Sequence, residues 1–136
     1  HKQPNYSAYN TYQEAAARLF AEHPDVDGIF GTDLYAAACL QYALSHGIRV
    51  PHDVKIVAYD GTHITRFLNP DMTTICQPIQ ELADESVRLI TELIKGNTIH
   101  EKEIILPVRL RRGNTTTGNA AAESTETDRT AALLQQ

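Results

Sequence analysis

The sequence lacks several features that would assign it to a class at once. No apolar run approaches the ~20 residues that a membrane-spanning helix needs, and no charged start followed by an apolar stretch indicates a secretory signal. The formal net charge is −5, whereas a surface that neutralises DNA phosphates would be basic. The 136 residues therefore predict one small domain that does not itself touch DNA or a membrane.

Cysteine is sparse, and no initiator methionine is present. Cys39 and Cys76 lie far apart in the sequence, whereas a small secreted scaffold carries more cysteines. We interpret the two as reduced thiols of a cytoplasmic protein. The chain begins with His1, which we interpret as the truncated start of a longer protein.

Catalytic motifs are also missing. No Ser, Cys and His stand in a nucleophile motif, and neither a phosphate loop nor a dinucleotide fingerprint occurs, so no cofactor is expected. The six histidines are scattered, without the short spacing of a metal-ligand pair. Asp33 and Asp60 could form an acid/base pair, which leaves an enzyme open as an alternative. We expect a binding module, without catalytic or metal-binding residues.

Helical and extended patterns alternate along the chain. Apolar spacing and end signals predict helices over residues 7–22, 34–45 and 79–95. Short apolar runs predict strands over residues 26–31, 54–59, 72–76 and 103–110. The first two suit buried strands, and Pro107 places the last at an edge or a bend. This alternation predicts an α/β fold with a parallel sheet covered by helices.

The end of the sequence has a different composition. Residues 114–136 contain little large apolar content before Leu133 and Leu134. Such a composition buries too little apolar surface to offset the ordering of the chain. We interpret it as a mobile tail.

Polar residues follow three of the predicted strands. Thr32 and Asp33 come after the first, the Asp60-Gly61-Thr62 turn after the second, and Gln77 after the third. In an open parallel sheet, ligands bind outside the carboxyl ends of the strands, and carboxylates accept hydrogen bonds from sugar hydroxyls. The pattern indicates a small-ligand site, with helix capping and turn chemistry as the alternative. Capping alone would account for Asp33.

Four blocks of the sequence resemble one family. They are residues 29–33 (IFGTD) with Ala36 and Ala37 downstream, 46–60 (HGIRVPHDVKIVAYD), 69–78 (NPDMTTICQP) and 105–116 (ILPVRLRRGNTT). The blocks occur in order across residues 5–116, and together they resemble the bacterial transcription repressors of the lactose/galactose type.

The resemblance implies a fold and a function. It implies a periplasmic-binding-protein-like type I core with two α/β lobes and an effector in the cleft between them. Residues 1–116 would form the C-terminal part of this core, covering most of one lobe plus a crossover into the other, and residues 117–136 a disordered tail. The parent would be a sugar-responsive repressor that binds operator DNA through an N-terminal domain missing here.

The resemblance also implies roles for particular residues. The predicted ligand contacts, to a sugar or sugar phosphate, are Tyr6, Thr32, Asp33, Asp60 and Gln77. Tyr6 would stack on the effector ring, although an aromatic residue near a helix start can instead pack inside the lobe. The surface implied for a homodimer consists of Ala37, Ala38, Ile64, Phe67 and Leu68. The alternative for the alanines is close packing of their helix on the sheet.

Two further alternatives remain at this stage. A periplasmic sugar receptor of a transport system shares the fold, although the turn at Arg49-Val50-Pro51 and the block at Leu106-Pro107-Val108 favour the repressors. The fragment could also be a structural half-domain without activity of its own. The residues at the crossover, in the predicted helix over residues 79–95, would then expose an apolar stripe.

Overall fold

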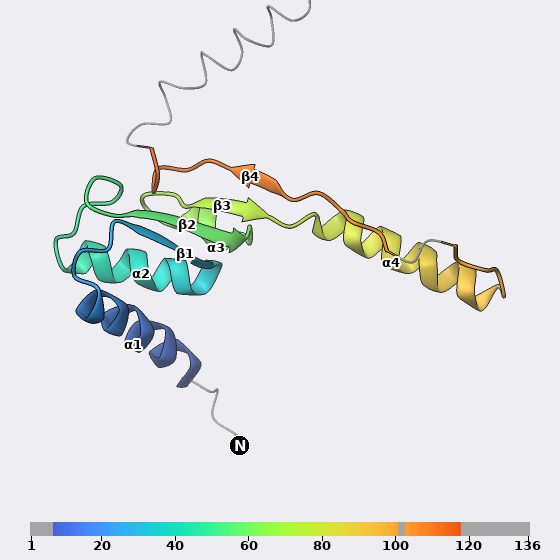
Figure 1. The fold of residues 1–136 in the computed structure, drawn as a ribbon, viewed down its shortest axis with the longest axis horizontal. Helices are drawn as coiled ribbons and strands as arrows, with labels where there is room; N and C mark the ends of the chain where they lie inside the picture. The colour runs from blue at the N-terminus through green and yellow to red at the C-terminus, as the bar shows by residue number, and fades with distance from the viewer. Residues whose placement is uncertain (1–6, 101–102, 118–136) are drawn as a thin grey trace, which may run out of the picture.

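The computed structural model describes residues 7–100 and 103–117 (Figure 1). Its elements, in chain order, are α1 (Ser7–Glu22), β1 (Gly28–Thr32), α2 (Asp33–Ser45), β2 (Lys55–Asp60), α3 (Ile64–Phe67), β3 (Thr73–Cys76), α4 (Ile79–Ile94) and β4 (Arg109–Arg111). The three long predicted helices and the first three predicted strands are present within two residues of their expected ends. The four-residue helix α3 was not predicted.

The four strands form one sheet in the order β1-β2-β3-β4. The first three run parallel, with Phe30 opposite Val57 and Tyr59 opposite Ile75. Strand β4 lies at the edge and pairs antiparallel with β3. The prediction of a strand over residues 103–110 was wrong in extent, because the ladder holds only Arg109–Arg111. Pro107, which has no N–H to donate, lies just before that ladder.

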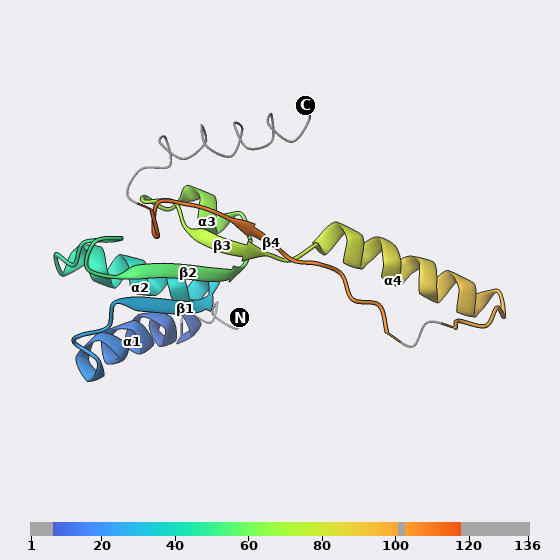
Figure 2. The same ribbon diagram turned by 45° about the horizontal axis from the view of Figure 1, so that its top comes forward.

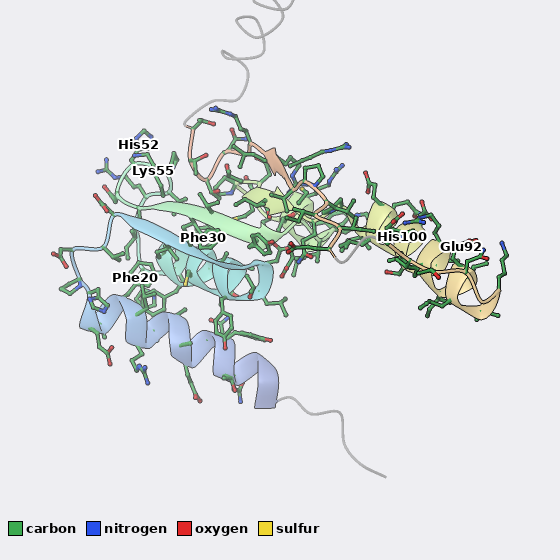
Figure 3. The ribbon with its side chains drawn as sticks, turned by 45° about the vertical axis from the view of Figure 1, so that its right-hand side comes forward. Phe20, Phe30, His52, Lys55, Glu92 and His100 are labelled. Atoms are coloured by element: carbon green, nitrogen blue, oxygen red, sulfur yellow. The ribbon has the colours of Figure 1, made fainter. Side chains whose placement is uncertain are left out.

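Helices α2 and α1 lie as successive layers on one face of the sheet (Figures 1 and 2). Helix α2 contacts β1 and β2, and α1 packs against α2. Ala36 and Ala43 of α2 are fully buried, because their small side chains let the helix approach the strands closely. Phe20 of α1 points toward α2 (Figure 3) and stacks on Tyr42 with ring centroids 5.0 Å apart.

The opposite face of the sheet is open within the described part of the chain. Ile29, Ile56 and Ala58 are buried toward α2, whereas Phe30 is 65% exposed. Phe30 contacts Tyr59 edge to face, with centroids 6.2 Å apart. The prediction that β1 and β2 are buried strands was therefore wrong for one face, because the described helices α1 and α2 both cover the other.

Helix α4 extends away from the sheet (Figure 1), and none of its residues is buried. Its large apolar side chains are exposed, among them Ile79, Val87, Ile90 and Ile94. The chain returns beside it through Ile104 and Leu106. This is the exposed apolar stripe that the sequence predicts for a crossover helix. Among the described helices, none combines the length and apolar content that crossing a membrane requires.

The segment after β4 belongs to the fold. Thr115 is fully buried, its hydroxyl donates to the Ile56 carbonyl at 2.6 Å, and the same hydroxyl accepts from the Thr73 N–H at 3.0 Å. The prediction of a mobile tail from Asn114 onward was therefore wrong for its first residues, since Thr115 bonds to both β2 and β3. Residues 118–136 lie outside the described part of the chain.

Candidate functional site

The carboxyl ends of the parallel strands bring two of the predicted ligand residues together. Asp60 ends β2 and Gln77 directly follows β3. The Gln77 side chain donates from Nε2 to Asp60 Oδ1 at 2.7 Å, and its backbone N–H donates to the Asp60 carbonyl at 3.2 Å. Both residues are half-buried, so the pair is fixed in place while remaining accessible.

The backbone at this edge is unusual. Asp60 has a φ of 126° and Gly61 a φ of 75°. Positive φ is uncommon for a residue with a side chain, and such outliers concentrate at functional sites. A Cβ on Gly61 would lie 2.6 Å from the Cα and Sγ of Cys76. Only glycine therefore fits between the end of β2 and the end of β3.

Asp33 has a different environment from the one predicted. Its side chain is 2% exposed. Oδ2 accepts from the Thr62 N–H at 2.6 Å and from the Thr62 hydroxyl at 2.5 Å, and Oδ1 accepts from the Thr74 hydroxyl at 3.1 Å. Helix capping does not account for this residue, since its carboxylate bonds to the loop after β2 and to β3. Both carboxylate oxygens of Asp33 therefore accept hydrogen bonds from within the fold, whereas Asp60 is half-buried at the strand end.

The remaining predicted ligand residues flank this pair. Thr32 is the N-cap residue of α2, but its side chain makes no capping hydrogen bond. It is exposed at the end of β1. Tyr6 lies outside the described residues.

Cys39 and Cys76 are free thiols, and burial raises the pKa of Cys39, which favours its unreactive protonated form. Among residues 7–100 and 103–117, no three His, Cys, Asp or Glu side chains gather as a metal site would require. At the carboxyl ends of the strands, the Asp60 carboxylate and the Gln77 amide are hydrogen-bonding groups.

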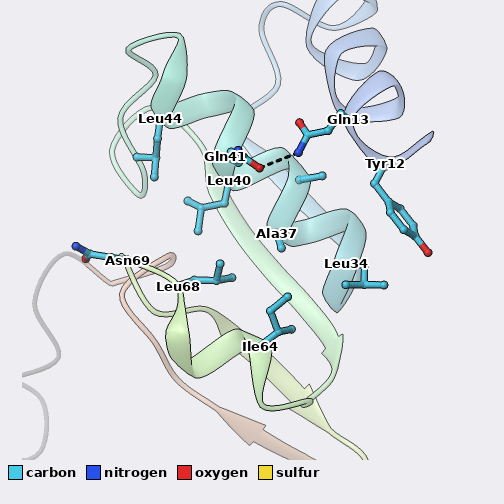
Figure 4. Close-up of a pocket in the computed structure, with 11 residues that line it drawn as sticks. Tyr12, Gln13, Leu34, Ala37, Leu40, Gln41, Leu44, Ile64, Leu68 and Asn69 are labelled. Atoms are coloured by element: carbon cyan, nitrogen blue, oxygen red, sulfur yellow. Dashed lines mark hydrogen bonds between the residues drawn. The ribbon is translucent and has the colours of Figure 1, made fainter. Parts of the chain in front are cut away.

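A second feature is an apolar groove of about 310 Å³ between α1, α2 and α3 (Figure 4). Its lining includes Ala37, Ala38, Ile64 and Leu68, four of the five residues predicted at a dimer surface. At its rim, Gln13 Nε2 donates to Gln41 Oε1 at 2.7 Å.

The predicted surface residues differ in exposure. Phe67, which is not part of the lining, is 86% exposed. Ala38 is buried in the core, which fits the alternative that this alanine allows close packing of its helix on the sheet. Ile64, in contrast, is exposed.

Sequence patterns indicated the Asp60-Gly61-Thr62 turn but missed Thr65 and Arg111, which help to hold it in place. Thr62, Thr65 and Arg111 contact one another or Asp33 from three separate segments. Arg111 is 46 positions from Thr65 in the sequence, so no local spacing could indicate the contact. In the sequence, Arg111 is marked only by its place in residues 105–116, the last of the four blocks that resemble the repressor family.

The sequence matches a periplasmic binding protein-like domain over residues 1–116. It is 37% identical over 97 residues to the ribose operon repressor of Bacillus subtilis (strain 168), which covers 71% of this chain and 30% of that repressor. It is 33% identical over 103 residues to the HTH-type transcriptional regulator CelR of Thermobifida fusca, which covers 75% of this chain and 30% of that regulator. The chain thus spans under a third of each of these relatives.

Solved structures agree with these matches. A complex of the transcriptional regulator CelR with cellobiose superimposes with a TM-score of 0.73 at 31% identity, covering 79% of this chain and 33% of that one. A LacI family transcriptional regulator from Arthrobacter sp. FB24 in complex with lactose gives a TM-score of 0.71 at 31% identity, covering 79% and 42%.

Proposed function

Because this chain belongs to the periplasmic binding protein-like family, and its relatives include repressors of the lactose/galactose type, we propose that it senses a sugar for a transcriptional repressor. The chain forms part of the effector-binding core of a longer protein. DNA binding belongs to a separate domain of that protein, since this chain carries a net charge of −5. The parent acts in the cytoplasm, as a regulator of transcription must in a bacterium, and neither catalyses a reaction nor enters a membrane.

The observation that carries this proposal is the Asp60–Gln77 pair at the carboxyl ends of β2 and β3. A half-buried carboxylate accepts hydrogen bonds from sugar hydroxyls more strongly than a neutral oxygen does. Gln77 holds that carboxylate in one orientation before the ligand arrives, which lowers the entropy that binding costs. Two structurally similar proteins were solved in complex with cellobiose and with lactose.

In the proposed complex, a sugar or sugar phosphate enters a cleft between this lobe and the rest of the parent core. Asp60 accepts from its hydroxyls, while Gln77 and Thr32 bond to it from the neighbouring strand ends. Tyr6 stacks on one face of the ring. Closure of the two lobes around the ligand then shifts the equilibrium between an open and a closed state of the protein. The size of this shift is set by the difference in the ligand's affinity for the two states.

The apolar groove between α1, α2 and α3 forms part of a homodimer surface in this proposal. Ala37, Ile64 and Leu68 line it, and Phe67 projects beside it. An exposed apolar patch with few polar groups is typical of a protein–protein interface. The dimer places two DNA-binding domains at a fixed separation, which the sugar-bound state changes.

The test uses the full-length parent protein. Its affinity for ribose, cellobiose, lactose and sucrose is measured by calorimetry, and its binding to the DNA upstream of its own gene is measured with and without each sugar. We expect one sugar of this kind to bind and to change the DNA affinity by at least about fivefold, the lower end of typical coupling between two sites. Sugar binding without any effect on DNA would contradict the repressor and favour a transport receptor, and turnover of a sugar derivative would indicate an enzyme.

A further inference from the structure

The buried carboxylate of Asp33 is one end of a hydrogen-bonded chain that crosses the lobe. From the other end, Arg111 Nη2 donates to Thr65 Oγ1 at 2.5 Å, and Thr65 Oγ1 donates to the Thr62 carbonyl at 2.7 Å. Thr62 then donates to Asp33 from both its N–H and its hydroxyl. The chain therefore joins a guanidinium on β4 to a carboxylate at the start of α2.

The direction of these bonds is fixed. A guanidinium can only donate and a carboxylate can only accept, so the Thr65 hydroxyl, which accepts from Arg111, must give its proton to the Thr62 carbonyl. At Thr62 the link is covalent, because its carbonyl and its N–H belong to two different peptide groups, so the four residues are joined mechanically and not as one continuous row of polarised bonds. Thr65 is fully buried and Asp33 almost so, whereas Thr62 between them is exposed. Water therefore competes least for the bonds at Thr65 and Asp33, and a buried hydrogen bond is electrostatically stronger than one in water.

The chain connects the two surfaces of the proposed function. Thr62 ends the Asp60-Gly61-Thr62 turn whose first residue faces the ligand. Thr65 belongs to α3, which also carries the groove residue Ile64. Thr65 is also bonded to the residue directly before β3, because its carbonyl accepts from the Met72 N–H at 3.0 Å. A displacement at either surface must strain the same few bonds.

We infer that Arg111, Thr65, Thr62 and Asp33 act as a strut that holds the ligand-facing turn and α3 in one rigid unit. Asp33 and Arg111 are then positioning residues that touch neither the sugar nor the partner subunit. This inference rests on the proposed function for the identity of the two surfaces. A residue in the strut should affect both surfaces, whereas one with a local role should affect only its own side.

The decisive variants are substitutions of one arginine. Arg111→Met keeps most of the aliphatic stem and removes the bonds to Thr65 and to the Met72 carbonyl. Arg111→Lys restores a cationic donor. Arg109→Met is the matched control, because Arg109 lies two residues earlier on β4 and is directed to the exposed Glu81 at 3.5 Å.

Two dissociation constants are measured on the full-length protein, that of the sugar found in the panel above and that of the dimer. We expect Arg111→Met to raise both about tenfold, in line with the loss of a hydrogen bond to a charged group. Arg111→Lys should return both to within about threefold of the natural protein, and Arg109→Met should change neither. A change in only one of the two constants, whether that of the sugar or that of the dimer, or in neither constant, overturns the strut.

A separate measurement covers failure of the proposed function. If none of the four sugars binds the natural protein, hydrogen exchange of the Thr62 amide tests the strut directly, since that amide donates to Asp33. Exchange at least about tenfold faster in Arg111→Met supports the strut, and unchanged exchange overturns it.

If Arg111→Met does not fold, Thr62→Val and Thr62→Ser replace it, because Thr62 is exposed. Of these two variants, only Thr62→Ser keeps the hydroxyl that donates a hydrogen bond to Asp33. The strut is supported if both dissociation constants rise in Thr62→Val and return toward the natural values in Thr62→Ser. It is overturned if the two variants have the same dissociation constants.

Discussion

The side-chain amide of Gln77 and the carboxylate of Asp60 join the ends of two parallel strands through a hydrogen bond of 2.7 Å. The bond engages Oδ1, and within the described part of the chain no donor contacts Oδ2. Asp60 is the last residue of β2 and has an unusual backbone conformation, with φ at 126°. These properties are those of a preorganised acceptor for a ligand hydroxyl.

Replacing Asp60 should remove most of the affinity for the sugar. In Asp60→Ala, two or more charge-assisted hydrogen bonds are lost, so we expect the sugar dissociation constant to rise by at least about 30-fold. Calorimetry on the full-length protein measures this change. Asp25→Asn is the control, because Asp25 is exposed in the connection before β1, at the opposite edge of the sheet. Affinity within about threefold of the natural protein in Asp60→Ala would show that the site is elsewhere.

Replacing Gln77 should have a smaller effect of the same sign. Gln77→Leu removes the donor that orients Asp60 and keeps a similar volume, so the carboxylate remains but is no longer fixed. We expect the sugar dissociation constant to rise about fivefold, as for one hydrogen bond of about 1 kcal/mol. The double variant Asp60→Ala/Gln77→Leu separates the two roles of Gln77. Losses that add in the double variant support the proposed direct bond from Gln77 to the sugar, and a double variant that binds no more weakly than Asp60→Ala contradicts that bond and means that Gln77 acts through Asp60 alone.

Gly61 should tolerate no side chain. Gly61→Ala adds a Cβ only 2.6 Å from the backbone of Cys76, in addition to the cost of the left-handed conformation. Gly96→Ala is the matched control, because Gly96 has a similar φ of 78° with nothing near its Cβ position. We expect Gly61→Ala to lower the free energy of unfolding by about 1–3 kcal/mol more than the control does. Chemical denaturation measures both free energies of unfolding. Equal decreases in Gly61→Ala and Gly96→Ala would mean that the positive φ, and not the contact with Cys76, requires glycine at position 61.

The sequence predicts what depends on local pattern and misses what depends on partners distant in the chain. Helix α4 has sixteen residues with a clear apolar period, so it was predicted closely. Helix α3 has four residues, fewer than the period needs to repeat. Asp33 was predicted as a ligand contact, with helix capping as the alternative, because the next helix begins there. Its carboxylate instead accepts hydrogen bonds from Thr62 and Thr74 in two other segments.

The end of the chain illustrates the same limit. Thr115 lies in a run of polar residues that composition assigns to a tail. It is buried because Ile56, Asp71 and Thr73 supply its hydrogen-bond partners, which no composition can indicate. Thr115 also lies inside the last of the four blocks that carry the family resemblance, a signal that composition does not contain.

The connection between α2 and β2 should respond to acid through one ion pair. Arg49 donates to Asp53 from Nε and from its backbone N–H, and the side-chain bond is the main reason that the pKa of Asp53 falls to about 2. Because the folded pKa is lowered, the pair is intact above the ordinary value of 3.8 and is lost as the pH falls through about 2. NMR titration should give an Asp53 pKa near 2 that rises toward 3.8 in Arg49→Met. A titration unchanged by that substitution would contradict the contact.

A charge in the apolar groove should separate the proposed dimer without unfolding its subunits. Ala37 lines the groove on α2 and is half-buried, so Ala37→Glu places a carboxylate among Leu34, Ile64 and Leu68, where a partner would exclude water. We expect the dimer dissociation constant of the full-length protein to rise by at least about 30-fold, because an unpaired carboxylate at a dry interface costs more than 2 kcal/mol. Sedimentation equilibrium measures this change.

The control for that substitution is Ala21→Glu, an equal change at an exposed position near the end of α1. It should leave the dimer intact. Thermal unfolding distinguishes a lost interface from a damaged fold, since the groove is already open to water in the single subunit and can solvate the new carboxylate there. A dimer that survives Ala37→Glu would mean that the groove lies outside the interface, and the exposed apolar residues of α3 would then need a different partner.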